Sequence, residues 1–174
     1  MSRKDEISSL IKKIAEDAVI YRRYFELDEL VPQFGKPASK NNIDKIKSMF
    51  SGDLPEDYID LISLHDGIKN FDAPDMEILS TDFLTKNPGV LEEVFVNANR
   101  FDKGEIFIVF QEASDPHSVA FRRSGEGRVT VIDFDAQDDI AEFDTLLDYL
   151  NFRSDDLRKA ISRFEADRKG LLDD

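Results

Sequence analysis

A helix that begins with a proline, one third of the way along the chain, constrains the fold most. Pro55 fits the first turn of a helix, because its missing backbone N–H would have no partner there. The helix then carries an apolar stripe at helical spacing, made by Tyr58, Leu61 and Ile62. Gly67 can adopt the left-handed conformation that ends helices. The sequence therefore predicts one helix at about residues 42–50 and a second at about residues 55–64.

Runs of β-branched and aromatic residues between turn residues predict strands. Three such runs occur in the second half of the chain, at residues 105–111, 118–123 and 128–134. The last two flank residues 124–127, which contain two glycines, so they are expected to form an antiparallel hairpin. A further short strand is expected at 77–79, whereas 68–74 is expected to be a loop. Residues 90–99 fit either a helix or a strand.

Both ends of the chain carry amphipathic helical patterns. Residues 5–30 place apolar side chains on one helical face, and residues 154–169 repeat this pattern behind Ser154, a favourable N-cap. Another helix is predicted at residues 138–149. The order of helices, antiparallel strands and helices predicts an α+β fold in which helices pack on a small sheet. Free terminal helices would expose their apolar stripes, so we expect both of them to pack on the core or on each other.

The length and composition limit the class of protein. A chain of 174 residues is an ordinary size for one domain, and we expect residues 1–174 to form one. No apolar run approaches the ~20 residues that a transmembrane helix needs. The charged N-terminus lacks the apolar stretch of a secretory signal, and the chain has no Cys for disulfides. These features predict a cytoplasmic protein that does not enter the membrane.

The negative charge is concentrated in the middle of the chain. Residues 51–150 carry 23 acidic and 7 basic side chains, whereas residues 1–50 carry 8 and 10 and residues 151–174 carry six of each. Direct binding of nucleic acid is therefore not expected, because proteins meet phosphates with Lys and Arg. A basic protein partner suits this charge better. Solubility alone is the alternative explanation.

The densest acidic stretch, at residues 133–148, contains no basic residue. Asp133 and Asp135 alternate along the end of a predicted strand and so can project from one face of it. Asp138 and Glu142 share one face of the predicted helix. In the alternative interpretation, Asp138 and Asp139 only stabilise the helix N-terminus and the other acids are solvated. The predicted partner-binding residues are Asp133, Asp135, Asp138, Asp139 and Glu142.

Residues suited to catalysis or metal binding are few. His65 next to Asp66 could be a base held by a carboxylate, but a histidine at the end of a helix is the simpler interpretation. Asp115 and His117 supply only two possible metal ligands, which do not make a site. The sequence contains no P-loop, nucleophile elbow or dinucleotide-binding fingerprint. We therefore expect no catalytic residues, no cofactor and no metal, and predict that the chain is not an enzyme.

The proline-initiated helix resembles a feature of the SMI1/KNR4 family, also called the SUKH superfamily. Members of this family have a short helix followed by a Leu-Pro-x-x-Tyr helix that ends in Asn-Gly or a similar pair. This chain has Leu54, Pro55, Tyr58 and Gly67 at these places, and Asp66 where Asn is usual. Both Asp and Asn tolerate the turn that ends a helix.

The rest of the family pattern is similar in its order. The family continues with strands, a turn containing glycine and a closing helix introduced by an apolar-acidic run, which residues 140–147 resemble. The resemblance covers about residues 40–152, and the two terminal helices extend beyond it. It implies a SUKH-like α+β fold with N-terminal helices, an antiparallel sheet and C-terminal helices.

The resemblance also implies a function. Bacterial members of the family look like immunity proteins, which bind a cognate toxin and block it by protein–protein contact. The implied partner is then a toxin protein, such as a basic nuclease, and the acidity of this chain suits that role. Eukaryotic members look like regulators, so a non-enzymatic regulatory or scaffold protein is the alternative.

Overall fold

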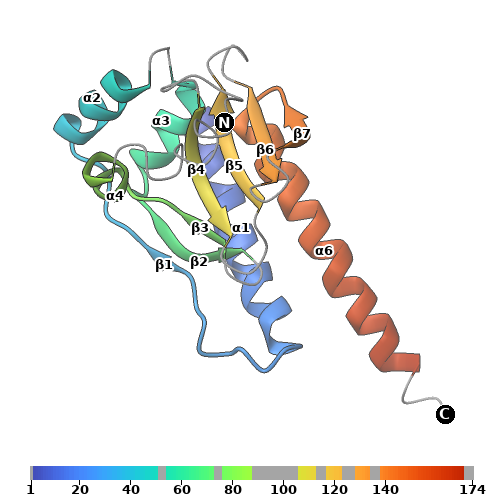
Figure 1. Cartoon of the computed structure of the whole chain (residues 1–174). Helices are drawn as coiled ribbons and strands as arrows, with labels where there is room; N and C mark the ends of the chain where they lie inside the picture. The colour runs from blue at the N-terminus through green and yellow to red at the C-terminus, as the bar shows by residue number, and fades with distance from the viewer. Residues whose placement is uncertain are drawn as a thin grey trace.

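The computed structural model describes residues 2–50, 54–72, 76–87, 106–112, 117–122, 128–133 and 138–170. They form, in chain order, α1 (Arg3–Arg23), β1 (Gln33–Phe34), α2 (Lys40–Met49), α3 (Glu56–Ile62), β2 (Ile68–Asp72), β3 (Met76–Ile78), α4 (Thr81–Lys86), β4 (Ile106–Glu112), β5 (His117–Arg122), β6 (Val129–Asp133), β7 (Asp138–Phe143) and α6 (Leu146–Gly170). Helices thus precede and follow a sheet (Figure 1), which confirms the predicted α+β class.

The sheet has seven strands, and their order in space is their order in the chain. Every neighbouring pair is antiparallel, from β1–β2 to β6–β7. Strands β4, β5 and β6 lie where the sequence predicts strands, and β5 pairs with β6 as expected, with Ser118 opposite Ile132. The predicted hairpin turn at 124–127 and the ambiguous segment 90–99 lie outside the described residues.

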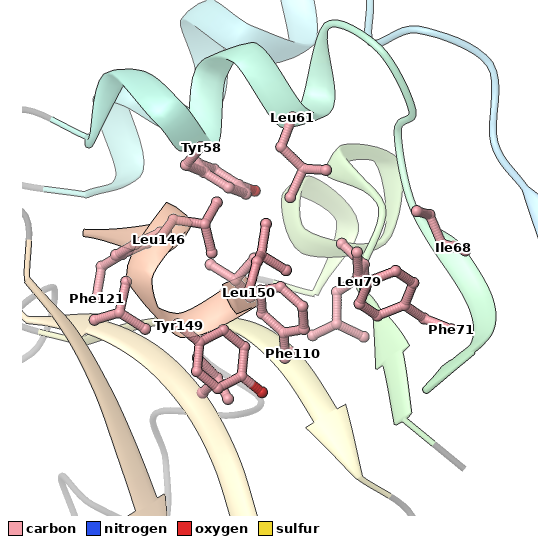
Figure 2. Close-up of a cluster of buried hydrophobic side chains, with 14 of the residues drawn as sticks. Tyr58, Leu61, Ile68, Phe71, Leu79, Phe110, Phe121, Leu146, Tyr149 and Leu150 are labelled. Carbon is pink, nitrogen blue, oxygen red and sulfur yellow. The ribbon is translucent and has the colours of Figure 1, made fainter. Parts of the chain in front are cut away.

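Helix α3 packs onto the core face of the sheet. Its predicted stripe of Tyr58, Leu61 and Ile62 is fully buried, which confirms that these residues form the inward face of the helix. The ring of Tyr58 contacts Phe107 and Phe121, with centroids 5.8 and 5.2 Å away. Figure 2 shows Tyr58 and Leu61 directed from α3 toward the sheet, where they meet Leu146 and Leu150 of α6.

The terminal helices α1 and α6 pack against each other, as the sequence predicts. The ring of Phe164 on α6 stacks on Tyr24, with centroids 5.1 Å apart. An ion pair joins Arg158 Nε to Asp17 Oδ2 at 2.8 Å. Helix α1 lies behind the sheet, and the last turns of α6 extend past it (Figure 1).

Helix α1 ends earlier than residue 30. Its C-cap is Tyr24, and Glu26 then adopts a left-handed conformation with φ of 59°. The buried Arg22 holds this turn, because its guanidinium donates to the carbonyl of Leu30 and to that of Asn70 on β2, at 2.9 and 2.7 Å. The end of α1 is thus set by a contact with a distant strand.

The prediction of a helix at residues 138–149 is wrong. Residues 138–143 form β7, which pairs with β6 and extends the sheet. Helix α6 starts only after Thr145, whose hydroxyl accepts the N–H of Asp148 at 3.0 Å and donates to the Asp148 carboxylate at 2.6 Å. This Thr-x-x-Asp arrangement is similar to a capping box, and it marks the true start of the helix.

Two other predictions also need correction. Ser154 is not an N-cap, because α6 runs through it without a break and the residue is fully buried. The segment expected to be a loop at 68–74 contains β2 instead. Its register shifts between Ile68 and Asp72, and Asn70 has φ of 51°, so the alternation that identifies strands is interrupted.

Candidate partner-binding site

The acidic edge of the sheet is built by β7 and the start of α6. Helix α6 is held beside β7 by the buried Asp57 of α3, whose Oδ2 accepts the N–H of Leu147 at 3.2 Å. Burial raises the pKa of Asp57, although the backbone hydrogen bonds from the start of α6 act in the opposite direction. The proline-initiated helix therefore stabilises the start of α6 beside the acidic edge.

Two of the five predicted partner-binding residues are neighbours in the sheet. Asp133 is the last residue of β6 and Asp138 is the first residue of β7, and they are directly opposite each other in the ladder. Asp135 lies outside the described residues. The structure thus brings Asp133 and Asp138 together through strand pairing and not through a helix.

The other two predicted residues lie on β7 with cations beside them. The Asp139 carboxylate pairs with Arg122 at 2.5 Å, and Glu142 pairs with Arg128 at 3.4 Å. Arg128 also lies 3.6 Å from Asp144. These acids remain about half exposed or more, so each ion pair contributes only about 0–1 kcal/mol. Strand pairing therefore supplies cations that the acidic run itself lacks.

A bulge in β7 exposes an apolar side chain among these acids. Asp139 is opposite Ile132 and Ala141 is opposite Val131, so Ile140 is an extra residue without a partner on β6. Bulges of this kind redirect side chains at sheet edges. Ile140 is 49% exposed, whereas the predicted helix would have turned it inward.

Helix α6 adds a second exposed apolar residue that sequence reasoning missed. Phe152 is 49% exposed, and its ring contacts that of Phe143 on β7, with centroids 5.2 Å apart. Exposed aspartates lie on the same side of the helix, four residues before Phe152 and three and four residues after it, at Asp148, Asp155 and Asp156. If residues 146–170 are read as one helix, Leu146, Leu150 and Leu157 form its inward stripe. Phe152 lies outside this stripe and is therefore expected to be exposed.

A separate cleft of about 610 Å³ lies at the opposite side of the sheet, between β1–β4 and α4. Its aromatic lining residues Phe34 and Phe83 are 42% and 39% exposed. One wall requires glycine, because a Cβ on Gly35 would lie 2.1 Å from the carbonyl oxygen of Asp66. Lys69, Glu77 and Asp66 are the charged residues that line the cleft, one positive and two negative. It therefore has no charge preference comparable to that of the acidic edge.

The residues considered for catalysis have other contacts. The ring of His65 packs on Phe34, with centroids 4.9 Å apart, and its Nδ1 lies 3.3 Å from the carbonyl oxygen of Gly35. The Asp66 carboxylate accepts hydrogen bonds from the N–H and the hydroxyl of Thr81, at 2.5 and 2.6 Å. Asp66 thus serves the start of α4 and not the imidazole.

The two possible metal ligands, Asp115 and His117, are not part of a metal site in the described residues. Asp115 lies outside the described residues, and His117 is described only as the first residue of β5. Within the described part of the chain, no group of three or more His, Asp or Glu side chains is arranged to hold a metal. No helix of that same part combines the length and apolarity needed to cross a membrane.

Comparisons of this chain with protein-family models and with curated proteins give no match.

Proposed function

We propose that this chain is an immunity protein of the SMI1/KNR4 type, which binds a cognate toxin and neutralises it by protein–protein contact. The observation that carries the proposal is the unit from Leu54 to Gly67. Leu54 and Tyr58 are buried in the core, and Gly67, which lies directly before β2 and after the C-cap of α3 at Ser63, has φ of +85°, a conformation that glycine adopts readily. These are positions on which the family resemblance rests, and the burial of Leu54 and Tyr58 supports the proposal.

The order of the elements gives further support. A short helix precedes α3, an antiparallel meander follows it, and the long helix α6 closes the fold. The proposal of a SUKH-like fold requires this order. The terminal parts of α1 and α6 are then additions that pack on each other outside the common core.

The chemistry of the surface favours binding over catalysis. His65 and Asp66 are held by different groups, so they do not form a base and its orienting carboxylate. The chain has a formal net charge of −14. An acidic inhibitor associates rapidly with a basic enzyme and competes with an acidic substrate such as nucleic acid. A toxin that cleaves nucleic acid is therefore the partner class that the charge favours.

Coexpression tests the proposal. The product of the gene adjacent to the one for this chain is expressed alone and with this chain, and growth is measured. We expect the neighbour to be toxic alone, tolerated in the presence of this chain, and recovered with it as a stable complex. A neighbour that is harmless, or toxic to the same degree with this chain, contradicts the proposal and favours the regulatory or scaffold alternative.

A further inference from the structure

We propose that Ile140 and Phe152 are the apolar anchors of the partner interface, and that a basic segment of the partner covers them. This inference rests on the proposed immunity function and names the surface that performs it. The acidic residues around the two anchors then form the rim of the interface. Together, Ile140, Phe143 and Phe152 form the "anchor surface".

Two apolar side chains of the anchor surface are exposed. Ile140 and Phe152 are each 49% exposed, the largest values among the exposed large hydrophobic residues of the described chain. They come from two elements that contact each other through the Phe143 and Phe152 rings. The bulge directs Ile140 outward from the sheet edge. Exposed apolar side chains on neighbouring elements of a highly charged protein are typical of a site of interaction.

Acidic side chains lie around these residues. Phe152 lies among the exposed aspartates Asp148, Asp155 and Asp156 of its own helix face, and Glu142 and Asp144 lie on the strand side. A second copy of this chain would bring the same carboxylates against each other, which like-charge repulsion opposes. A partner with Lys and Arg has the complementary charge. An Arg side chain can also lie over the exposed Phe152 ring in a cation–π contact.

The anchor surface differs in charge from the cleft at the opposite side of the sheet. The cleft at Phe34 and Phe83 is lined by one positive side chain, Lys69, and two negative ones, Glu77 and Asp66, and the Asp66 carboxylate already accepts two hydrogen bonds from Thr81, so the cleft favours a basic partner less strongly. The anchor surface combines apolar residues at its centre with acids at its rim. Interfaces with strong binding residues have this arrangement. The anchor surface is therefore the better site for a basic toxin.

The test compares two matched double variants in the full-length chain, with the purified product of the adjacent gene as the binding probe. Ile140→Ala with Phe152→Ala removes the anchors, and Phe34→Ala with Phe83→Ala removes two other exposed apolar residues, from the cleft. We expect the first variant to bind at least about 30-fold more weakly and the second to bind within about 3-fold of the parent, since central apolar residues dominate interface energies. Thermal unfolding of both variants confirms that each is folded.

A second measurement does not depend on mutation. Hydrogen exchange of the complex is expected to show new protection at residues 139–144 and 148–156 and unchanged exchange at residues 33–35 and 66–69. Equal binding by the parent and the anchor variant, or protection confined to the cleft, overturns this inference but leaves the immunity function intact. A parent chain that neither binds nor neutralises the neighbour overturns both. A parent dimer that the anchor variant converts to monomer also overturns the inference, because the anchors then contact a second copy.

Discussion

Asp57 Oδ2 accepts a hydrogen bond at 3.2 Å from the backbone N–H of Leu147, which lies 90 residues further along the chain. The first N–H groups of a helix have no partners within it. A carboxylate at this end also interacts favourably with the helix dipole. A buried side chain of α3 therefore stabilises the start of α6. This hydrogen bond connects the proline-initiated helix to the acidic edge.

Replacement of Asp57 by Ala should destabilise the protein by about 1–3 kcal/mol, because it leaves buried backbone N–H groups without an acceptor. The matched control is Glu56→Ala, which removes the neighbouring carboxylate. Glu56 is exposed and pairs with Arg3 at the surface, so its loss should cost about 0–1 kcal/mol. Urea unfolding measures both, and equal effects at the two positions would contradict the assigned role of Asp57.

The contribution of Asp57 to stability should also depend on pH. Burial raises its pKa above the ordinary value of 3.8. The folded state then binds the proton more tightly than the unfolded state, so the stability due to Asp57 falls as the pH rises from 3.8 through the folded pKa. We expect the unfolding free energy of the parent, minus that of Asp57→Asn, to decrease across this interval and to be level on either side. Urea unfolding at a series of pH values measures this difference, and an increase with pH would show that hydrogen bonding outweighs burial.

The tyrosine of the proline-initiated helix should act through its ring and not its hydroxyl. Tyr58 is fully buried, burial raises its pKa, and its hydroxyl has no hydrogen-bond partner within the described part of the chain. We expect Tyr58→Phe to be neutral or to stabilise by up to about 1 kcal/mol, and Tyr58→Ala to cost about 3–5 kcal/mol. Thermal and urea unfolding distinguish these outcomes. A large loss in Tyr58→Phe would mean that the hydroxyl makes an essential hydrogen bond.

Replacement of Thr145 and of Ser154 by alanine should have different effects on the free energy of unfolding. Thr145→Ala removes the cap and should destabilise by about 1 kcal/mol. Ser154→Ala should be neutral or slightly stabilising, because Ser154 is buried inside the helix and Ala is the better helix former. Chemical unfolding of the two single variants is sufficient. A loss of stability in Ser154→Ala and none in Thr145→Ala would favour the prediction of two separate helices over one continuous α6.

The parts of the fold that local patterns specify were predictable from the sequence. Strands β4–β6 are runs rich in β-branched and aromatic residues, and Pro55 and Gly67 lie directly before α3 and directly before β2, where their own backbone preferences fit. Strand β7 was not predictable in this way. Its opening acids suit a helix N-terminus, and the bulge at Ile140 interrupts the alternation, so its conformation is decided by pairing with β6.

The candidate site was predictable in its charge but not in its shape. Asp139 and Glu142 are on the exposed edge, as the acidic run suggested. Their cations Arg122 and Arg128 lie outside that run and become neighbours only through strand pairing. Ile140 was missed because the helix predicted at residues 138–149 turned it inward, and Phe152 was missed because it lay between that helix and the one predicted at residues 154–169, whereas α6 runs through it.

The acids and their cations should have opposite effects on toxin binding. The proposed partner is basic, so Asp139→Asn with Glu142→Gln should slow association, whereas Arg128→Gln should speed it by freeing Glu142 and Asp144. Each effect should be several-fold at low salt and should shrink at about 0.5 M salt, where screening acts within a few ångströms. Stopped-flow or surface-binding kinetics against the adjacent gene product give both rates. Because these groups are exposed, the changes should appear in the association rate with little change in thermal stability. If Arg128→Gln slows association instead, Arg128 itself contacts the partner, and the acidic residues of β7 are then a solvated surface outside the interface.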